Sequence, residues 1–212
     1  MILKKASYKA IKYACLKFHY AKSIPVNVFG YSVFNNKKEW CGVVLYGAGA
    51  NNNIGKEFNL EQGKVVELVR MALNGKQEST SKALSISLKL IKKYLPLCEL
   101  VISYADLDQK HIGTIYQATN WHYIGISMKD KHDSSWIINR KRIHGRVISE
   151  WIKKAGGLKG LSRKEFIIKN YDNNSQPYIT RGKIKYVYCL NKKLNQYINK
   201  IKKEYIKNAS IA

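Results

Sequence analysis

The sequence predicts an α/β protein of the α+β type, in which a central mixed, twisted sheet is flanked by helices. Three observations lead to this prediction. The segment 100–128 reads as a buried strand, an acidic turn, a short helix and a second strand. The apolar run 65–73 is typical of a central strand and precedes a long amphipathic segment. Two further strands, 26–34 and 39–46, flank a polar turn and indicate a hairpin.

The first helix is expected over 6–21, because apolar residues recur there at helical spacing and Pro25 ends the pattern. Its apolar stripe consists of Ile11, Cys15 and Phe18. After the hairpin, Gly47–Gly55 is rich in glycine and asparagine and is expected to be a mobile loop. It lacks the lysine–serine pair and the strand–helix context of a P-loop.

The next helix should begin where Ser79, Thr80 or Ser81 can cap it and end near Pro96. Its apolar face is formed by Leu84, Leu88, Ile91 and Leu95. The N–H groups of the first turn and the positive end of the helix dipole face the same point. This end of the helix is therefore a candidate anion site, suited to a pyrophosphate.

Asp106 follows the strand that starts at Leu100, so it should lie at the carboxyl end of that strand, where ligands collect in open α/β sheets. Asp106 and Tyr116, one helix further on, are candidate reaction-centre residues. The structural alternative is that Asp106 only caps the following helix and Tyr116 only packs in the core. Arg70 stands in an apolar strand and must point outward or find an anionic partner.

Beyond residue 130 the pattern changes. A helix is expected within 137–154, a basic and turn-rich stretch over 158–175, a strand over 183–190 and a lysine-rich amphipathic helix over 194–206. We therefore expect one domain over residues 1–212, with a core of about 1–130 and a basic C-terminal strand and helix extension of about 131–212.

The net charge of +24 indicates a polyanionic partner, of which nucleic acid is the natural candidate. Residues 140–212 carry 19 basic and 4 acidic side chains, so the excess is concentrated late in the chain. AT-rich coding also favours lysine and explains part of the excess. No run of apolar residues is long enough for a membrane span or a signal peptide, and the dispersed cysteines form no CxxC pair. We expect a cytoplasmic protein with reduced thiols; whether it is a monomer or a homodimer stays open.

The strand–helix–strand order resembles the GNAT acyltransferases, and IYQATNWHYIG is similar to the end of their last motif. The resemblance implies coenzyme A at the long helix and Tyr116 as proton donor to the leaving thiolate. Their glycine-rich loop is replaced by Gln77–Lys82. The ordered segments KFHYAKSIP, VELVRMAL, the serine loop, SYADLDQKHIGTIYQATNW and KIKYVYCL resemble, more narrowly, the phage Mom family of DNA-modification proteins.

The Mom resemblance implies that adenine N6 in DNA is converted to a methylcarbamoyl derivative, which protects phage DNA in the host cytoplasm from restriction. It implies catalytic roles for His19, Tyr20, Arg70, Ser81 (or Ser79), Asp106 and Tyr116. A coenzyme A thioester such as acetyl-coenzyme A would be held by Lys76, Ser79, Thr80, Ser81 and Lys82. If iron takes part, His19 and Asp106 are the expected ligands, because imidazole plus carboxylate suits non-haem iron.

DNA would be held by a basic group near one helix, which is made up of Arg140, Lys141, Arg142, Arg146, Lys153 and Lys154. Reaching N6 requires an extruded or single-stranded base, on which Trp121, Trp136 or Tyr178 could stack. Two other functions stay open: a GNAT-type acyltransferase acting on a small amine or a protein, and a non-catalytic nucleic-acid-binding protein on an α/β scaffold.

Overall fold

The computed structural model describes residues 1–49 and 53–201, which fold into two compact units. The core unit consists of the described residues within Met1–Ala105, His111–Gly125 and 184–201. The inserted unit consists of Asp106–Lys110 and Ile126–Lys183. The chain therefore leaves the core unit twice and returns to it each time.

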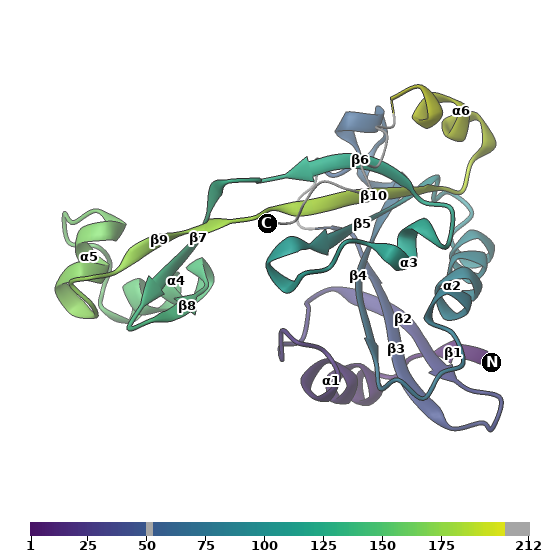
Figure 1. Cartoon of the computed structure of the whole chain (residues 1–212), viewed down its shortest axis with the longest axis horizontal. Helices are drawn as coiled ribbons and strands as arrows, with labels where there is room; N and C mark the ends of the chain where they lie inside the picture. The colour runs from purple at the N-terminus through teal and green to yellow at the C-terminus, as the bar shows by residue number, and fades with distance from the viewer. Residues whose placement is uncertain (50–52, 202–212) are drawn as a thin grey trace. The chain divides into compact units, whose positions relative to one another are not determined.

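Helices and 3₁₀ turns follow one another as α1 (Tyr8–Lys17), η1 (Lys56–Phe58), η2 (Gln62–Lys64), α2 (Thr80–Tyr94), η3 (Leu107–Gln109), α3 (Thr114–Gln117), α4 (Gly145–Lys154), α5 (Arg163–Asn170) and α6 (Lys192–Ile201). The strands are β1 (Ile2–Lys5), β2 (Val28–Phe34), β3 (Trp40–Gly47), β4 (Val65–Leu73), β5 (Leu100–Asp106), β6 (His122–Ser127), β7 (Lys131–Ile138), β8 (Lys141–Ile143), β9 (Gln176–Thr180) and β10 (Lys183–Cys189). In the described residues they form a seven-stranded sheet, β1-β2-β3-β4-β5-β10-β6, and a three-stranded sheet, β8-β7-β9 (Figure 1).

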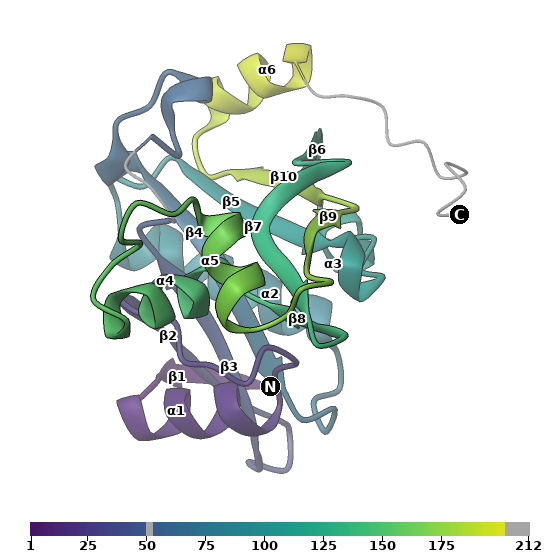
Figure 2. The ribbon, with the colours of Figure 1, turned by 90° about the vertical axis from the view of Figure 1, so that its left-hand side faces the viewer.

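The larger sheet is mixed, as predicted: β1 to β4 are antiparallel neighbours, and β4 and β5 are parallel. Alternation along β3 sends side chains to both faces. Val43 and Leu45 pack in one buried cluster with Ile11 of α1, whereas the Tyr46 hydroxyl lies 2.6 Å from Ser87 Oγ of α2. α1 and α2 accordingly cover opposite faces of the sheet (Figure 1 and Figure 2).

α2 confirms the predicted helix after the serine loop. Ser79 is its N-cap, and the Ser79 Oγ accepts the Lys82 N–H at 3.1 Å. α1 is shorter than the predicted 6–21: it ends at Lys17, and Phe18 is its C-cap, whose N–H donates to the Ala14 carbonyl. His19 and Tyr20 consequently lie in the loop after α1 rather than on the helix.

β4 and β5 separate after a short parallel ladder, which joins Val65–Glu67 to Leu100–Ile102. Just beyond the ladder, the Ser103 hydroxyl donates to the Leu68 carbonyl at 2.9 Å, so a side chain takes the place of the next backbone bond. Both strands continue past this point and run apart (Figure 1). Backbone groups that lose ladder partners at such a fork need other ones, so the fork is a place where a bound molecule can contribute hydrogen bonds.

The inserted unit is built on the β7–β8 hairpin, whose turn residues Asn139 and Arg140 both have positive φ (49° and 61°). Its hydrophobic core is a cluster of Trp136, Ile138, Ile148 and Ile167. α5 corrects the prediction of a turn-rich stretch over 158–175, since Ser162 and Glu165 form a capping box at the start of this helix.

A charged network ties the first segment of the inserted unit to the second. The Asp108 side chain is only 3% exposed, and it accepts hydrogen bonds from Arg142 (2.9 Å), Thr180 Oγ1 (2.8 Å) and the Arg181 N–H (2.9 Å). Arg142 also pairs with Asp133. The loop that contains Asp106 is therefore anchored two residues further on.

The late part of the chain is arranged differently from the predicted C-terminal extension. β10 was expected as a strand, and it lies between β5 and β6 in the large sheet, so the chain from Ile184 belongs to the core unit. The predicted helix 194–206 is observed as α6 up to Ile201, and its remainder falls outside the described residues. Part of the predicted loop Gly47–Gly55, residues 50–52, also falls outside them.

A membrane-spanning helix is not found in the described part of the chain, where none is both long enough and apolar enough to cross a bilayer.

Candidate active site in the core unit

Arg70 is held by the loop that follows α1. The residue pairs with Leu45 across β3 and β4 and lies on the face that α1 covers. Its guanidinium donates to the Ser23 carbonyl oxygen and, at 3.1 Å, to the Ser23 hydroxyl. Burial raises the pKa of the neighbouring Cys15 thiol, and a hydrogen bond from Arg70 lowers it by less, so the net shift is upward. The partners of Arg70 are thus neutral groups.

In the described residues, no carboxylate lies within ion-pair distance of Arg70. The predicted alternatives for Arg70 were an outward orientation or an anionic partner, and the structure instead shows a half-buried guanidinium on neutral acceptors. A cation that keeps its charge uncompensated at a half-buried position favours an anionic ligand.

His19 is a neutral hydrogen-bond donor at physiological pH. The Ala21 N–H donates to its Nδ1 at 3.1 Å, and because a backbone N–H can only donate, the ring proton sits on Nε2. Burial, together with the positive charges of Arg70, His111 and Lys22, lowers the pKa of His19 from its ordinary 6.5 to about 4. His19 Nε2 is therefore a hydrogen-bond donor rather than a base.

This pKa predicts that the protein loses stability as the pH falls from about 6.5, the ordinary histidine value, toward 4. In that window the unfolded chain binds a proton at residue 19 and the folded chain does not, so acid favours unfolding. The midpoint of urea unfolding should drop less between pH 7 and pH 5 in His19→Gln than in the wild type. An NMR titration of His19 with a midpoint near the ordinary value would contradict the assignment.

Tyr20 and His111 continue the site from His19. The Tyr20 ring lies 4.3 Å from the His19 ring, tilted by 30°, and 5.6 Å from the His111 ring at 72°. His111 was not among the site residues predicted from the sequence. No local pattern could have done so, because the contact joins residues about ninety positions apart in the chain.

Tyr116 lies at the fork between β4 and β5. Its hydroxyl is 2.8 Å from Ser103 Oγ, and its ring packs against Trp121 and Tyr186 at 5.1 and 4.9 Å. Burial raises the pKa of the Tyr116 phenol, the bond from Ser103 lowers it, and the nearby Tyr20 raises it again, with a net rise. Tyr20 is thus within electrostatic range of Tyr116, and the phenol stays protonated at neutral pH. Ser103 is a second residue of this region that the sequence did not reveal.

Asp106 is in the inserted unit and acts as a cap. Its Oδ1 accepts the Asp108 N–H at 3.0 Å and starts η3, which is the structural role that the sequence allowed for it. Residues 1–49 and 53–201 contain no group of three or more His, Cys, Asp and Glu side chains that could hold a metal ion. A metal ion on His19 Nε2 would also need a lone pair on that nitrogen. The bond from the Ala21 N–H instead places the lone pair on Nδ1 and the ring proton on Nε2. The predicted iron ligands therefore do not fit an iron site.

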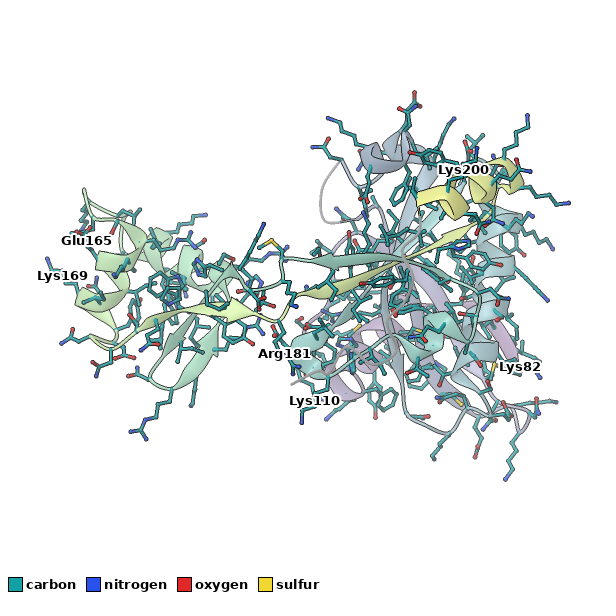
Figure 3. The ribbon with its side chains drawn as sticks, turned by 45° about the horizontal axis from the view of Figure 1, so that its top comes forward. Lys82, Lys110, Glu165, Lys169, Arg181 and Lys200 are labelled. Carbon is teal, nitrogen blue, oxygen red and sulfur yellow. The ribbon has the colours of Figure 1, made fainter. Side chains whose placement is uncertain are left out.

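The predicted coenzyme A loop forms the N-terminus of α2, where Lys82 is labelled in Figure 3. Ser79 Oγ lies 2.9 Å from Ser81 Oγ, and the Gln77 side-chain amide donates to Thr80 Oγ1 at 2.9 Å. The Glu78 carboxylate accepts the Asn36 N–H of the β2–β3 turn. An acidic side chain in this loop is thus occupied by the hairpin turn.

Of the six predicted DNA contacts, Arg142 is engaged within the inserted unit: it pairs with two carboxylates, and its guanidinium lies 3.8 Å from the centre of the Tyr178 ring. The other five are exposed at the β7–β8 turn and on α4, and they are Arg140, Lys141, Arg146, Lys153 and Lys154.

Comparison with known proteins agrees with the sequence resemblance. The family model described as the Mom protein family matches residues 1–207. The chain belongs to the Mom protein family. One Mom relative, the methylcarbamoylase mom of Escherichia phage Mu, is 27% identical over 188 residues, which is 85% of this chain and 72% of the relative. The predicted family is therefore confirmed.

The fold of this chain is that of the GNAT acetyltransferases, as predicted. A variant of the spermidine N-acetyltransferase SpeG from Vibrio cholerae superposes with a TM-score of 0.50 at 8% identity, covering 94% of this chain and 99% of that one. An acetyltransferase from Bacillus subtilis gives 0.46 at 12% identity, covering 89% and 98%. Identities this low concern the arrangement of the chain alone.

Proposed function

We propose that this protein is a phage-type DNA-modification enzyme that converts adenine N6 in DNA to a methylcarbamoyl derivative and so protects the DNA from host restriction. The observation that carries the proposal is that three residues of the Mom-like motifs, His19, Tyr20 and Arg70, gather in one cluster although they are spread over the first third of the chain. Membership of the Mom family, with a phage relative named a methylcarbamoylase, supports it.

The adenine amino group is a weak nucleophile, because its lone pair is delocalised into the ring, so a proton must leave N6 as the new bond forms. His19 does not take that proton at Nε2, which already carries one. The Mom resemblance gives this step to Asp106, whose Oδ1 caps η3 in the inserted unit. Arg70 stabilises negative charge that develops on the reacting carbonyl oxygen or on a phosphate.

Tyr116 supplies the proton that the leaving group takes up. Because the Ser103 hydroxyl has one hydrogen and donates it to the Leu68 carbonyl, the phenol must be the donor in its bond to Ser103. When the phenol gives its proton away, Ser103 can turn its own hydrogen toward the phenolate. The raised pKa of Tyr116 keeps this proton in place at neutral pH until it is needed.

We infer that a coenzyme A thioester such as acetyl-coenzyme A binds at the N-terminus of α2, where it would supply the carbon atoms of the added group; the amide nitrogen of that group must come from a second donor of the amine class. The chain offers the free amides of a 15-residue helix, the hydroxyls of Thr80 and Ser81, and the cations Lys76 and Lys82. Ser79 shapes the turn through its bond to the Lys82 N–H. The bond from the Asn36 N–H lowers the pKa of Glu78, so this carboxylate stays ionised and the cations Lys76 and Lys82 have to outweigh its charge.

Lys82→Ala should weaken acetyl-coenzyme A binding roughly tenfold, because one cation is lost next to the pyrophosphate. Isothermal titration calorimetry measures the change, and Lys89→Ala is the matched control, since this lysine is exposed on the same helix two turns away. Equal affinities of both variants and the wild type would place the thioester elsewhere.

DNA is the partner that the charge distribution favours. Residues 126–183 hold 14 Lys and Arg and 5 Asp and Glu, and most of the predicted basic contacts are exposed there. A polyamine substrate, the alternative suggested by small-amine acyltransferases, is itself a cation and would be repelled by a chain of net charge +24. For a phage-encoded protein, the host cytoplasm is the site of action.

A restriction assay tests the proposed function. Plasmid DNA from cells that express the protein should resist enzymes whose sites contain adenine and remain sensitive to enzymes whose sites contain only guanine and cytosine. DNA that is cut by both classes, although the protein is folded, would reject the proposal. Protection against both classes would indicate a covalent modification that is not confined to adenine, which also contradicts the proposal. Acetylation of spermidine by the purified protein would favour the small-amine alternative.

A further inference from the structure

The proposed reaction, on which this inference rests, requires an adenine outside the base stack. An extruded base is usually held by an exposed aromatic ring, because stacking works for any base with a π-face. The aromatic residues singled out from the sequence do not offer one: Trp121 and Trp136 are 6% and 5% exposed, and the Tyr178 ring is covered by the Arg142 guanidinium at 3.8 Å.

Tyr20 has the required exposure at the right place. Its side chain is 49% exposed, a large value for a tyrosine whose ring already contacts two others. The His19 ring, 4.3 Å away and tilted by only 30°, fixes the orientation of the Tyr20 ring. The same His19 is near Arg70, so a base on Tyr20 would be beside the cation that the proposed chemistry uses.

His111 stands nearly perpendicular to the Tyr20 ring, at 72° and 5.6 Å between centroids. His111 is exposed, and it is the first residue of the second segment of the core unit. Two residues later, Gly113 has φ +81°, and a Cβ there would approach the Tyr186 ring to 2.2 Å. This contact fixes the backbone that presents His111, because no other residue could take the place of Gly113 without displacing a buried tyrosine.

We propose that Tyr20 and His111 form the binding site for the extruded nucleobase, with the Tyr20 ring as the surface on which the base stacks and the His111 ring as the side wall that limits its position. The ligand is a purine base of single-stranded or locally opened nucleic acid. The His111 ring nitrogens provide a polar edge toward the base, and Tyr116, within electrostatic range of Tyr20, lies on the same side of the core unit.

A fluorescent base separates this site from the reaction. In a single-stranded thymine oligonucleotide with one 2-aminopurine, the amino group is not at position 6, so the base can stack but cannot be modified there. Binding to the wild-type protein should quench the fluorescence, and Tyr20→Ala and His111→Ala should lose most of the quench. The affinity of these variants for the same oligonucleotide, measured through the anisotropy of a terminal dye, should change less than about threefold, because phosphate contacts supply most of the affinity.

Ring-preserving variants make the test specific. Tyr20→Phe and His111→Phe keep an aromatic ring at each position and should restore the quench of 2-aminopurine fluorescence. If either ring had only a structural role, its replacement by alanine would not change this quench. Tyr94→Ala, which removes a 61% exposed tyrosine at the end of α2, is the matched control and should quench like the wild type.

Quenching by Tyr20→Ala and His111→Ala at the wild-type level would overturn the inference, and so would the absence of any quench in the wild type. A quench in the wild type that depends on both rings, combined with DNA that never gains an adenine adduct in cells, would support this site while rejecting the proposed function. The two failures are therefore distinguishable.

Discussion

Arg70→Gln slows the protection of plasmid DNA roughly 100-fold, the usual effect of removing one donor from a site that stabilises developing charge. The rate is measured as the time after induction at which plasmid becomes resistant to an enzyme with adenine in its site. Arg70 has no carboxylate partner in the described residues, so its charge is available to a ligand, and a neutral amide cannot replace it. Its bonds to Ser23 are to neutral oxygens, which glutamine can partly keep.

Lys12→Gln is the control for this substitution, because it removes one positive charge from an exposed position on α1. It should protect DNA at the wild-type rate. If the two variants slow protection equally, net charge rather than a site at Arg70 sets the rate. A wild-type rate for Arg70→Gln would remove Arg70 from the chemistry.

Asp108→Ala lowers the free energy of unfolding of the inserted unit by about 3 kcal/mol, the order expected when one partner of a buried charged network is removed. The substitution leaves the Thr180 hydroxyl, the Arg181 N–H and one side of the Arg142 guanidinium without their acceptor. Denaturant unfolding followed by tryptophan fluorescence measures the loss, because Trp136 and Trp151 lie in this unit.

The control is Glu150→Ala, which removes an exposed carboxylate from α4 of the same unit and should cost less than about 0.5 kcal/mol. A pH series adds a second check. Burial raises the pKa of the Asp108 carboxyl, but the bonds from Arg181, Thr180 and Tyr178 and the charge of Arg142 outweigh it, so the pKa lies below its ordinary value. Stability from this group is present above the ordinary carboxyl pKa and is lost as the pH falls through the lowered one. Equal losses in both variants would contradict the anchoring role.

Elements with a strong local pattern could be predicted from the sequence. β4 has the bounds of the apolar run 65–73, and α2 begins at its serine cap. α5 was missed although Ser162 and Glu165 form a capping box, because the lysines and glycines around them suggested turns. β7 was missed because the polar run from His132 to Ser135 shows no regular alternation, and its partner β9 is just as polar.

The site could be predicted only where a motif carried it. The family motifs marked Arg70 and Tyr116, but the contacts of Tyr20 with His111 and of Tyr116 with Ser103 depend on tertiary structure. A pattern of basic residues also could not show that Arg142 is bound by carboxylates distant in the chain. Long-range pairing of this kind has no local signature.

The central claim is that a site in the core unit, with Tyr116 as proton donor, modifies adenine at N6. Mass spectrometry of deoxynucleosides from cells that express the wild type, Tyr116→Phe or the surface variant Tyr94→Phe tests it most directly. We expect a heavier deoxyadenosine whose fragments place the added methylcarbamoyl group on N6, present in the wild type and Tyr94→Phe and nearly absent in Tyr116→Phe. Unmodified deoxyadenosine in cells that contain the folded wild type, or an undiminished adduct in Tyr116→Phe, would contradict the account.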